Sequence, residues 1–131
     1  LMARSLPYDQ RTAYEGKKRI PGTALNAKID ITHPLAFGLK AELYTLKFGT
    51  DALVPNAGLE TVGSYEKLNQ LNVAGYASPD NLGHLAENTF AGVVSLGRGK
   101  VVYLIDNTQY RMFWMGPSRM MQNAVMQIPG Y

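Results

Sequence analysis

Residues 90–105, FAGVVSLGRGKVVYLI, decide the fold. Two runs rich in β-branched and aromatic residues, 90–96 and 100–105, flank Gly97-Arg98-Gly99. Two such runs joined by a glycine-bearing three-residue loop predict a β-hairpin. The second run has no polar interruption over residues 101–105, which predicts a strand that is covered on both faces.

The segments before this hairpin predict further strands. In residues 23–31 every second side chain is apolar, which is the period of a half-buried strand. These apolar residues are Leu25, Ala27, Ile29 and Ile31. Shorter patterns predict strands at 43–48, 53–54 and 60–67. We therefore expect an α+β fold with a mixed sheet.

Helices are predicted at three places. A polar lead-in, residues 1–22, holds one short helix and ends at the turn signal Ile20-Pro21-Gly22. Residues 79–87 predict a second helix, and a final helix begins at Pro117, because proline favours the first helical position. The apolar stripe expected on the final helix consists of Met121, Ala124, Val125 and Ile128. Residues 23–131 then form a single domain or part of one.

The composition is that of one modest globular domain, with 131 residues, 46% hydrophobic and 18% charged. No stretch approaches the roughly 18 apolar residues that a membrane span needs, and the first residues carry no signal-peptide pattern. The chain begins inside a polar stretch without Met at position 1, which we interpret as a fragment of a longer protein. The net charge of +3 is spread out, and its one run, Lys17-Lys18-Arg19, indicates a solvated linker and not a nucleic-acid surface.

The chain contains no cysteine. Thiol catalysis, disulfide bonds and thiolate metal sites are therefore excluded for these 131 residues.

Several segments, in their order along the chain, resemble the C-terminal region of bacterial multi-domain zinc carboxypeptidases. In that family a domain resembling the class I glutamine amidotransferases follows the peptidase domain. The likeness extends from about residue 19 to about residue 128. The segments are Arg19-Ile20-Pro21-Gly22-Thr23, residues 30–39 (DITHPLAFGL), Gly75-Tyr76-Ala77-Ser78 with Asn81-Leu82, residues 97–103 (GRGKVVY), Asp106-Asn107, Arg111, Phe113-Trp114 and Asn123-Ala124.

The resemblance implies a flavodoxin-like domain of which this chain holds only the second part. The missing half is then replaced by a partner chain, by rearranged packing or by the rest of the parent protein. The implied parent removes C-terminal residues from peptides in the periplasm or outside the cell, with its zinc and general-base glutamate upstream of this chain. This segment is then non-catalytic, without a cofactor of its own. Its implied partners are the upstream peptidase domain or further copies of itself; the alternative is a stand-alone small-ligand-binding module.

His84-Leu85-Ala86-Glu87 has the His-x-x-Glu spacing of carboxypeptidase zinc ligands. A catalytic zinc needs a third protein ligand and an open position for water, and no histidine follows Glu87. We therefore interpret this segment as part of a surface helix.

His33, followed by Pro34, ends the first strand, because the residue before a proline is steered out of the helical region; a short turn or half-helix follows at 35–39. True glutamine amidotransferases carry a catalytic His-Pro-Glu element, but here Leu35 stands at the place of the carboxylate. Without a cysteine nucleophile the triad cannot form. His33 is therefore interpreted as capping the strand end through its ring nitrogens, or alternatively as contacting a ligand in an inherited pocket.

Asp106 and Asn107, with Arg111 and Trp114 close behind, are the strongest candidates for a site. They follow the strand predicted to be most buried, and ligand crevices of α/β sheets lie beyond the carboxyl ends of strands. One interpretation is a polar pocket or a contact surface toward the peptidase domain. The other is a capped loop in which Asp106 and Asn107 bond nearby backbone amides.

Methionines cluster near Phe113 and Trp114 around the final helix. They give a soft, adaptable apolar surface, most of which we assign to the core. Any part that is exposed is predicted to bind another chain. These methionines are Met112, Met115, Met120, Met121 and Met126.

Overall fold

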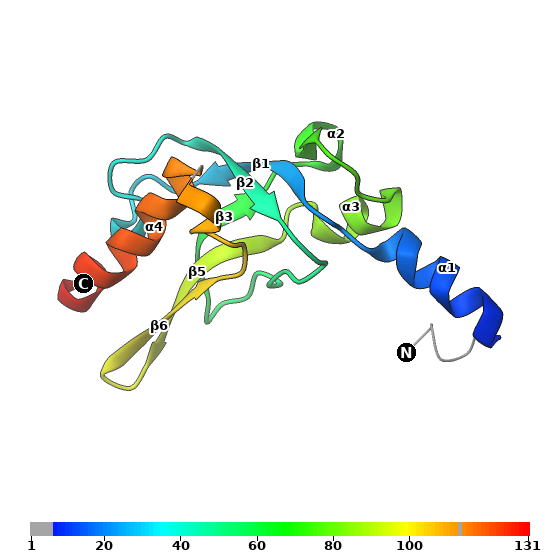
Figure 1. Cartoon of the computed structure of the whole chain (residues 1–131). Helices are drawn as coiled ribbons and strands as arrows, with labels where there is room; N and C mark the ends of the chain where they lie inside the picture. Colours follow the sequence, from blue (N-terminus) through cyan, green and yellow to red (C-terminus); the bar gives the residue numbers. More distant parts are fainter. Residues whose placement is uncertain (1–6, 113) are drawn as a thin grey trace.

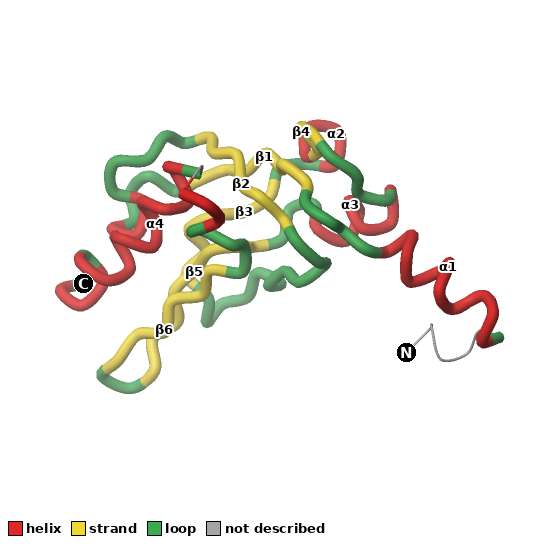
Figure 2. The backbone as a smooth tube through the Cα atoms, viewed as in Figure 1, coloured by secondary structure: helices red, strands yellow, loops and turns green. Residues whose placement is uncertain are grey.

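Six strands form one curled sheet in the computed structural model, which describes residues 7–112 and 114–131 (Figures 1 and 2). The order is β2-β1-β3-β5-β6, and β4 also pairs with β1. The strands are β1 (Thr23–Ile29), β2 (Glu42–Lys47), β3 (Glu60–Tyr65), β4 (Asn72–Ala74), β5 (Thr89–Leu96) and β6 (Gly99–Leu104).

Every pairing between these described strands is antiparallel, so the expectation of a mixed sheet is wrong for this part of the chain. The α+β class is confirmed. The flavodoxin-like assignment is not confirmed, because that fold is built on a parallel sheet.

The helices are α1 (Tyr8–Lys18), η2 (Pro34–Ala36), α2 (Leu68–Leu71), α3 (Pro79–Leu85), η3 (Tyr110–Met112), α4 (Met115–Met126) and η4 (Ile128–Gly130), where η marks a 3-10 turn. They flank this sheet, with α4 on one side and α2 and α3 near the other end, except for α1, which extends away from it (Figure 2). The helix predicted in the polar lead-in is confirmed as α1, and the half-helix after His33 as η2. The helix predicted at 79–87 is confirmed as α3, which Ser78 caps by accepting a hydrogen bond from the Asn81 N–H.

The alternation predicted for β1 is confirmed, with Leu25, Ala27 and Ile29 buried. Ile31 is exposed, so its place on the buried face is wrong. The strand ends earlier because the Asp30 carboxylate accepts hydrogen bonds from both the N–H and the hydroxyl of Thr32, which turns the chain.

The hairpin predicted at 90–105 is confirmed as β5 and β6, but the cover predicted for its second strand is wrong. β6 is the last strand of the sheet, and Val101 and Tyr103 are 37% and 39% exposed. The buried strand is β5, whose first five residues are all buried. Leu96 pairs with Gly99, so the connecting loop has two residues, the first being Gly97 in the left-handed region (φ 60°).

The final helix begins at Met115, before Pro117, and its predicted apolar stripe is right in part: Ile128 is buried in η4 and Ala124 is half-buried against the core. Met121 and Val125 are exposed, whereas Met120 and Asn123 are buried. The Asn123 side-chain amide donates to the carbonyl oxygens of Leu35 and Phe37, at 2.9 Å each, and this polar contact sets the rotation of α4. Of the methionine cluster, Met120 belongs to the core, while Met115, Met121 and Met126 are exposed. Phe113 and the side chain of Met112 lie outside the described residues.

Candidate functional site

Asp106 lies at the centre of a buried polar cluster that joins the two ends of the sheet. Its carboxylate accepts hydrogen bonds from the ammonium of Lys47 (Oδ1, 3.0 Å), the phenol of Tyr65 (Oδ1, 2.7 Å) and the hydroxyl of Thr45 (Oδ2, 2.7 Å). Lys47 and Thr45 belong to β2 and Asp106 follows β6, the strands at opposite ends of the sheet order. The cluster therefore holds the sheet in its curled shape, and we call it the clasp.

The clasp is electrically paired and closed to solvent. The side chains of Lys47 and Asp106 are each 1% exposed, and Lys47 also donates to the carbonyl oxygen of Asp51. Burial, and next the charge of Asp106, raise the pKa of the Tyr65 phenol far above its ordinary value. Tyr65 therefore stays protonated and acts as a donor. Burying such a pair costs desolvation, which the surrounding hydrogen bonds offset.

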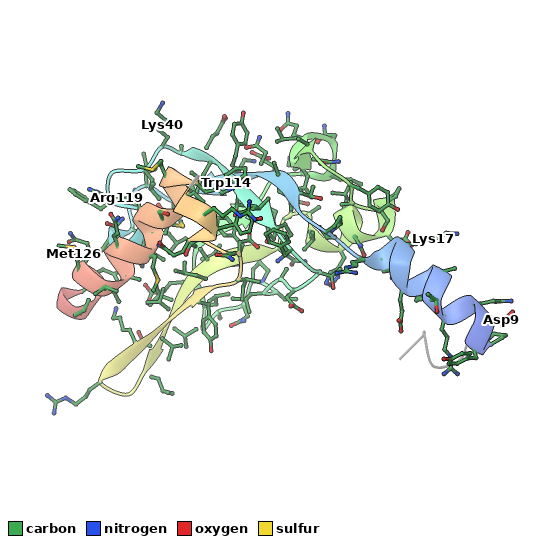
Figure 3. All side chains as sticks on the ribbon, in the orientation of Figure 1. Asp9, Lys17, Lys40, Trp114, Arg119 and Met126 are labelled. Atoms are coloured by element: carbon green, nitrogen blue, oxygen red, sulfur yellow. The ribbon has the colours of Figure 1, made fainter. Side chains whose placement is uncertain are left out.

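The other three residues predicted near Asp106 do not converge with it on a pocket. Asn107 is exposed, and its side chain accepts the Gln109 N–H at 3.2 Å in a local turn, as the capped-loop interpretation predicts. Arg111 is exposed, with φ at 49° and its guanidinium 5.4 Å from the ring of Tyr110. Trp114 is half-buried at the start of α4 (Figure 3). The partners of the Asp106 carboxylate are side chains of distant strands, so the prediction that it bonds nearby backbone amides is wrong.

His33 is buried and has a local structural role. Its Nδ1 accepts the Leu35 N–H at 3.1 Å, so the ring caps the start of η2 and not a strand end. Its Nε2 lies 3.4 Å from Oε2 of Glu60, and its ring packs edge-on against Tyr131, with centroids 5.0 Å apart. The Tyr131 hydroxyl also reaches Glu60, at 3.4 Å.

His84 and Glu87 are both on the surface, so the interpretation as a surface helix holds for His84 but not for Glu87, which is outside the helix. His84 lies in the last turn of α3, and Glu87 lies beyond the helix with φ at 62°. Within residues 7–112 and 114–131, no group of three or more His, Asp or Glu side chains is placed to hold a metal ion.

Two shallow grooves flank β6. The groove that we call the C-terminal groove has a volume of about 390 Å³ and lies between the hairpin and the end of the chain. The groove that we call the outer groove has a volume of about 350 Å³ and is largely apolar. The C-terminal groove is lined by Arg98, Lys100, Val102, Ile128 and Tyr131. The outer groove is lined by Leu53, Val54, Leu59, Val94 and Tyr103.

α1 projects from the body of the molecule at the end opposite the β5–β6 hairpin (Figure 1). None of its residues is buried, Tyr8 is 86% exposed, and Asp9 and Lys17 point away from the body (Figure 3). One hydrogen bond at its base, from the Asn81 side-chain amide to the carbonyl oxygen of Lys18 at 2.7 Å, ties it to α3.

The sequence singles out Asp106 and His33 as ligand-binding candidates, which stays a prediction, and it does not indicate the partners of Asp106 in the clasp. The available signal is Lys47, which shares the inward face of β2 with Leu43 and Thr45. A lysine at an inward position indicates a buried counter-charge elsewhere.

The sequence matches no protein-family model, no curated protein and no solved structure. None of the helices in the described residues is both long enough and apolar enough to cross a membrane.

Proposed function

We propose that this chain is a non-catalytic accessory segment that works by contact with another protein domain. The resemblance described above names the parent, a zinc-dependent carboxypeptidase of the periplasm or the extracellular space. In that proposal the zinc ion and the general base belong to the peptidase domain, and that domain is the partner of this segment. The alternative partner is a second copy of the chain, which would cover exposed apolar side chains.

The observation that carries the proposal is α1. It has 11 residues and no buried side chain, so the rest of the described chain gives it little tertiary support. Isolated helices shorter than about 12–15 residues are marginal in water. A helix of this length that projects from the body is therefore expected to be stabilised by a partner that covers it.

The chemistry of the described side chains supports the same conclusion. Asp106 accepts hydrogen bonds from three donors in the clasp, and Nδ1 of His33 is used as a cap. The alternative is a stand-alone ligand-binding module built around Asp106 and Arg111. It has less support, because Asp106 is buried and bonded within the protein, whereas Arg111 is exposed.

The glutamine amidotransferase-like origin stays a prediction from the resemblance. The antiparallel sheet gives no support to a flavodoxin-like arrangement. If the origin holds, the packing of this segment has been rearranged.

The proposal is tested by mixing the purified chain with a zinc carboxypeptidase domain from the same genome and following complex formation by sedimentation velocity. We expect a 1:1 complex that Tyr8→Lys with Tyr14→Lys weakens, because both tyrosines lie on α1. Val125→Lys is the matched control, since this exposed residue lies on α4, away from α1 (Figure 1). Absence of a complex, or equal weakening by both variants, would contradict the proposed role of α1.

A further inference from the structure

β6 is an open edge of the sheet. Antiparallel ladders alternate between pairs that exchange hydrogen bonds and pairs that do not. The Ile105 N–H donates to the Phe90 carbonyl at 2.8 Å, and the register continues as Leu104 with Ala91. By this alternation the backbone groups of Lys100, Val102 and Leu104 point away from β5, and they have no backbone partner among the described residues.

The outer groove runs beside this edge. Tyr103 lines this groove, and Val101, two residues earlier in the strand, points to the same side of the sheet. The loop carrying Val54 and Leu59 forms the other wall. This loop packs closely because Gly92 has no side chain: a Cβ there would lie 2.8 Å from Cδ1 of Leu59. The edge is thus bordered by apolar side chains. The one charged residue of β6 is Lys100, near the hairpin, and the rest of the strand lacks the charges or proline that commonly protect an exposed edge.

The hairpin end of the edge is positively charged. Arg98 and Lys100 make no ion pair with any described residue. The Nζ of Lys100 instead lies 3.8 Å from the ring centroid of Tyr131, across the C-terminal groove. Both cations are therefore available to a carboxylate brought by a partner.

We propose that β6 accepts an extended segment of a partner protein as an additional strand of the sheet. The backbone groups of Lys100, Val102 and Leu104 bond the segment, and its alternate apolar side chains contact the outer groove. A carboxylate of the segment pairs with Arg98 or Lys100. This surface is distinct from α1, so the inference goes beyond the proposed function and can fail or hold independently of it.

Charge favours a partner segment over a second copy of the chain. β6 reads Gly-Lys-Val-Val-Tyr-Leu and contains no acidic residue. Pairing two copies of β6 would bring together cations without supplying a carboxylate. A partner strand with acidic and apolar residues would form hydrogen bonds with the β6 backbone, cover the outer groove and pair with the cations.

The test is fluorescence anisotropy with the full chain and a labelled peptide of about ten residues, alternating valine and threonine with two glutamates at each end. Glutamates at both ends make the test independent of strand direction. The matched probe has lysines in place of the glutamates. We expect saturable binding of the glutamate peptide and about tenfold weaker binding of the lysine peptide, a difference of the size expected for a favourable against an unfavourable charge arrangement.

Three variants make the result specific. Val102→Pro removes an outward N–H and should weaken the glutamate peptide by about tenfold, because proline cannot donate to a strand ladder. Arg98→Glu with Lys100→Glu should reverse the preference between the two peptides. Val125→Lys, at an exposed position of α4, should change neither affinity. If Val102→Pro lowers the melting temperature, Tyr103→Lys takes its place, since it alters only the groove side chain.

Equal affinity for the two peptides, or unchanged binding to the edge variants, would overturn the proposal. Concentration-dependent dimerisation of the chain alone that Val102→Pro abolishes would also overturn it, because a second copy would then occupy the edge. Loss of the α1-dependent complex with normal peptide binding would leave this inference standing and count only against the proposed function.

Discussion

Lys47 and Asp106 are each 1% exposed, and their ion pair connects strands from the two ends of the sheet. Removing one member of a buried pair leaves the other charged and unpaired, at a cost of about 3–5 kcal/mol. We expect Asp106→Ala to lower the free energy of unfolding by this amount in urea denaturation. The control is Arg98→Gln, an exposed cation that makes no ion pair with any described residue, with an expected loss below about 0.5 kcal/mol. A loss for Asp106→Ala no larger than the control would contradict the role of the clasp.

Tyr65 adds a pH dependence to the same cluster. Its pKa in the folded protein is raised above the ordinary value of 10.0, first by burial and then by the Asp106 charge, so only the unfolded state releases this proton near pH 10. The contribution of Tyr65 to stability is therefore complete below pH 10 and falls as the pH rises further. Tyr65→Phe should be less stable than the unsubstituted chain by about 1.5–3 kcal/mol at neutral pH, the size expected for a hydrogen bond to a charged group. Urea titrations from neutral to alkaline pH should show this difference shrinking above pH 10, and a constant difference would contradict the assignment.

The sequence identifies some of the residues in these contacts but not their partners. Asp106 is identifiable because it follows a strand, and His33 because it precedes a proline. Their partners are not, because contact of Lys47 and Tyr65 with Asp106 depends on the curl of the whole sheet.

Alanine substitutions at Gly92 in β5 and Gly83 in α3 test how closely these two elements are packed. A Cβ at Gly92 would meet Leu59 at 2.8 Å and the carbonyl oxygen of Glu60 at 2.9 Å, whereas a Cβ at Gly83 meets nothing within 4 Å. We expect Gly92→Ala to destabilise the chain by about 1–3 kcal/mol through overpacking. Gly83→Ala, inside α3, should stabilise it by about 0.5–1 kcal/mol. Thermal unfolding of the two variants should shift in opposite directions, and shifts of the same sign would contradict this packing.

Local sequence patterns predict that a strand or helix is present better than they predict where it lies in the fold and which of its faces is buried. The period of β1 identifies both the strand and its buried face. The apolar run of β6 does not distinguish a central strand from an edge strand, because position in the sheet depends on distant pairings. The buried face of α4 follows the amide contacts of Asn123, which hydropathy does not reveal.

For the whole molecule, the contrast between α1 and the sheet predicts unequal stability. α1 has no buried residue, whereas β5 is buried over most of its length. Regions with few buried contacts open at little free-energy cost, and their amides exchange rapidly. We expect hydrogen–deuterium exchange of the isolated chain to be fast in α1 and slow in β5, and a partner to slow exchange in α1. Strong protection of α1 in the isolated chain would contradict the idea that a partner stabilises it.

The central claim is that this segment acts by contact and not by hydrolysis. The most direct measurement incubates the purified chain with zinc and a mixture of peptides with free C-termini, and follows peptide masses and retained zinc by mass spectrometry. We predict unchanged peptides and no stoichiometric zinc after dialysis. Removal of C-terminal residues by a chain that retains one zinc ion per molecule would contradict the account.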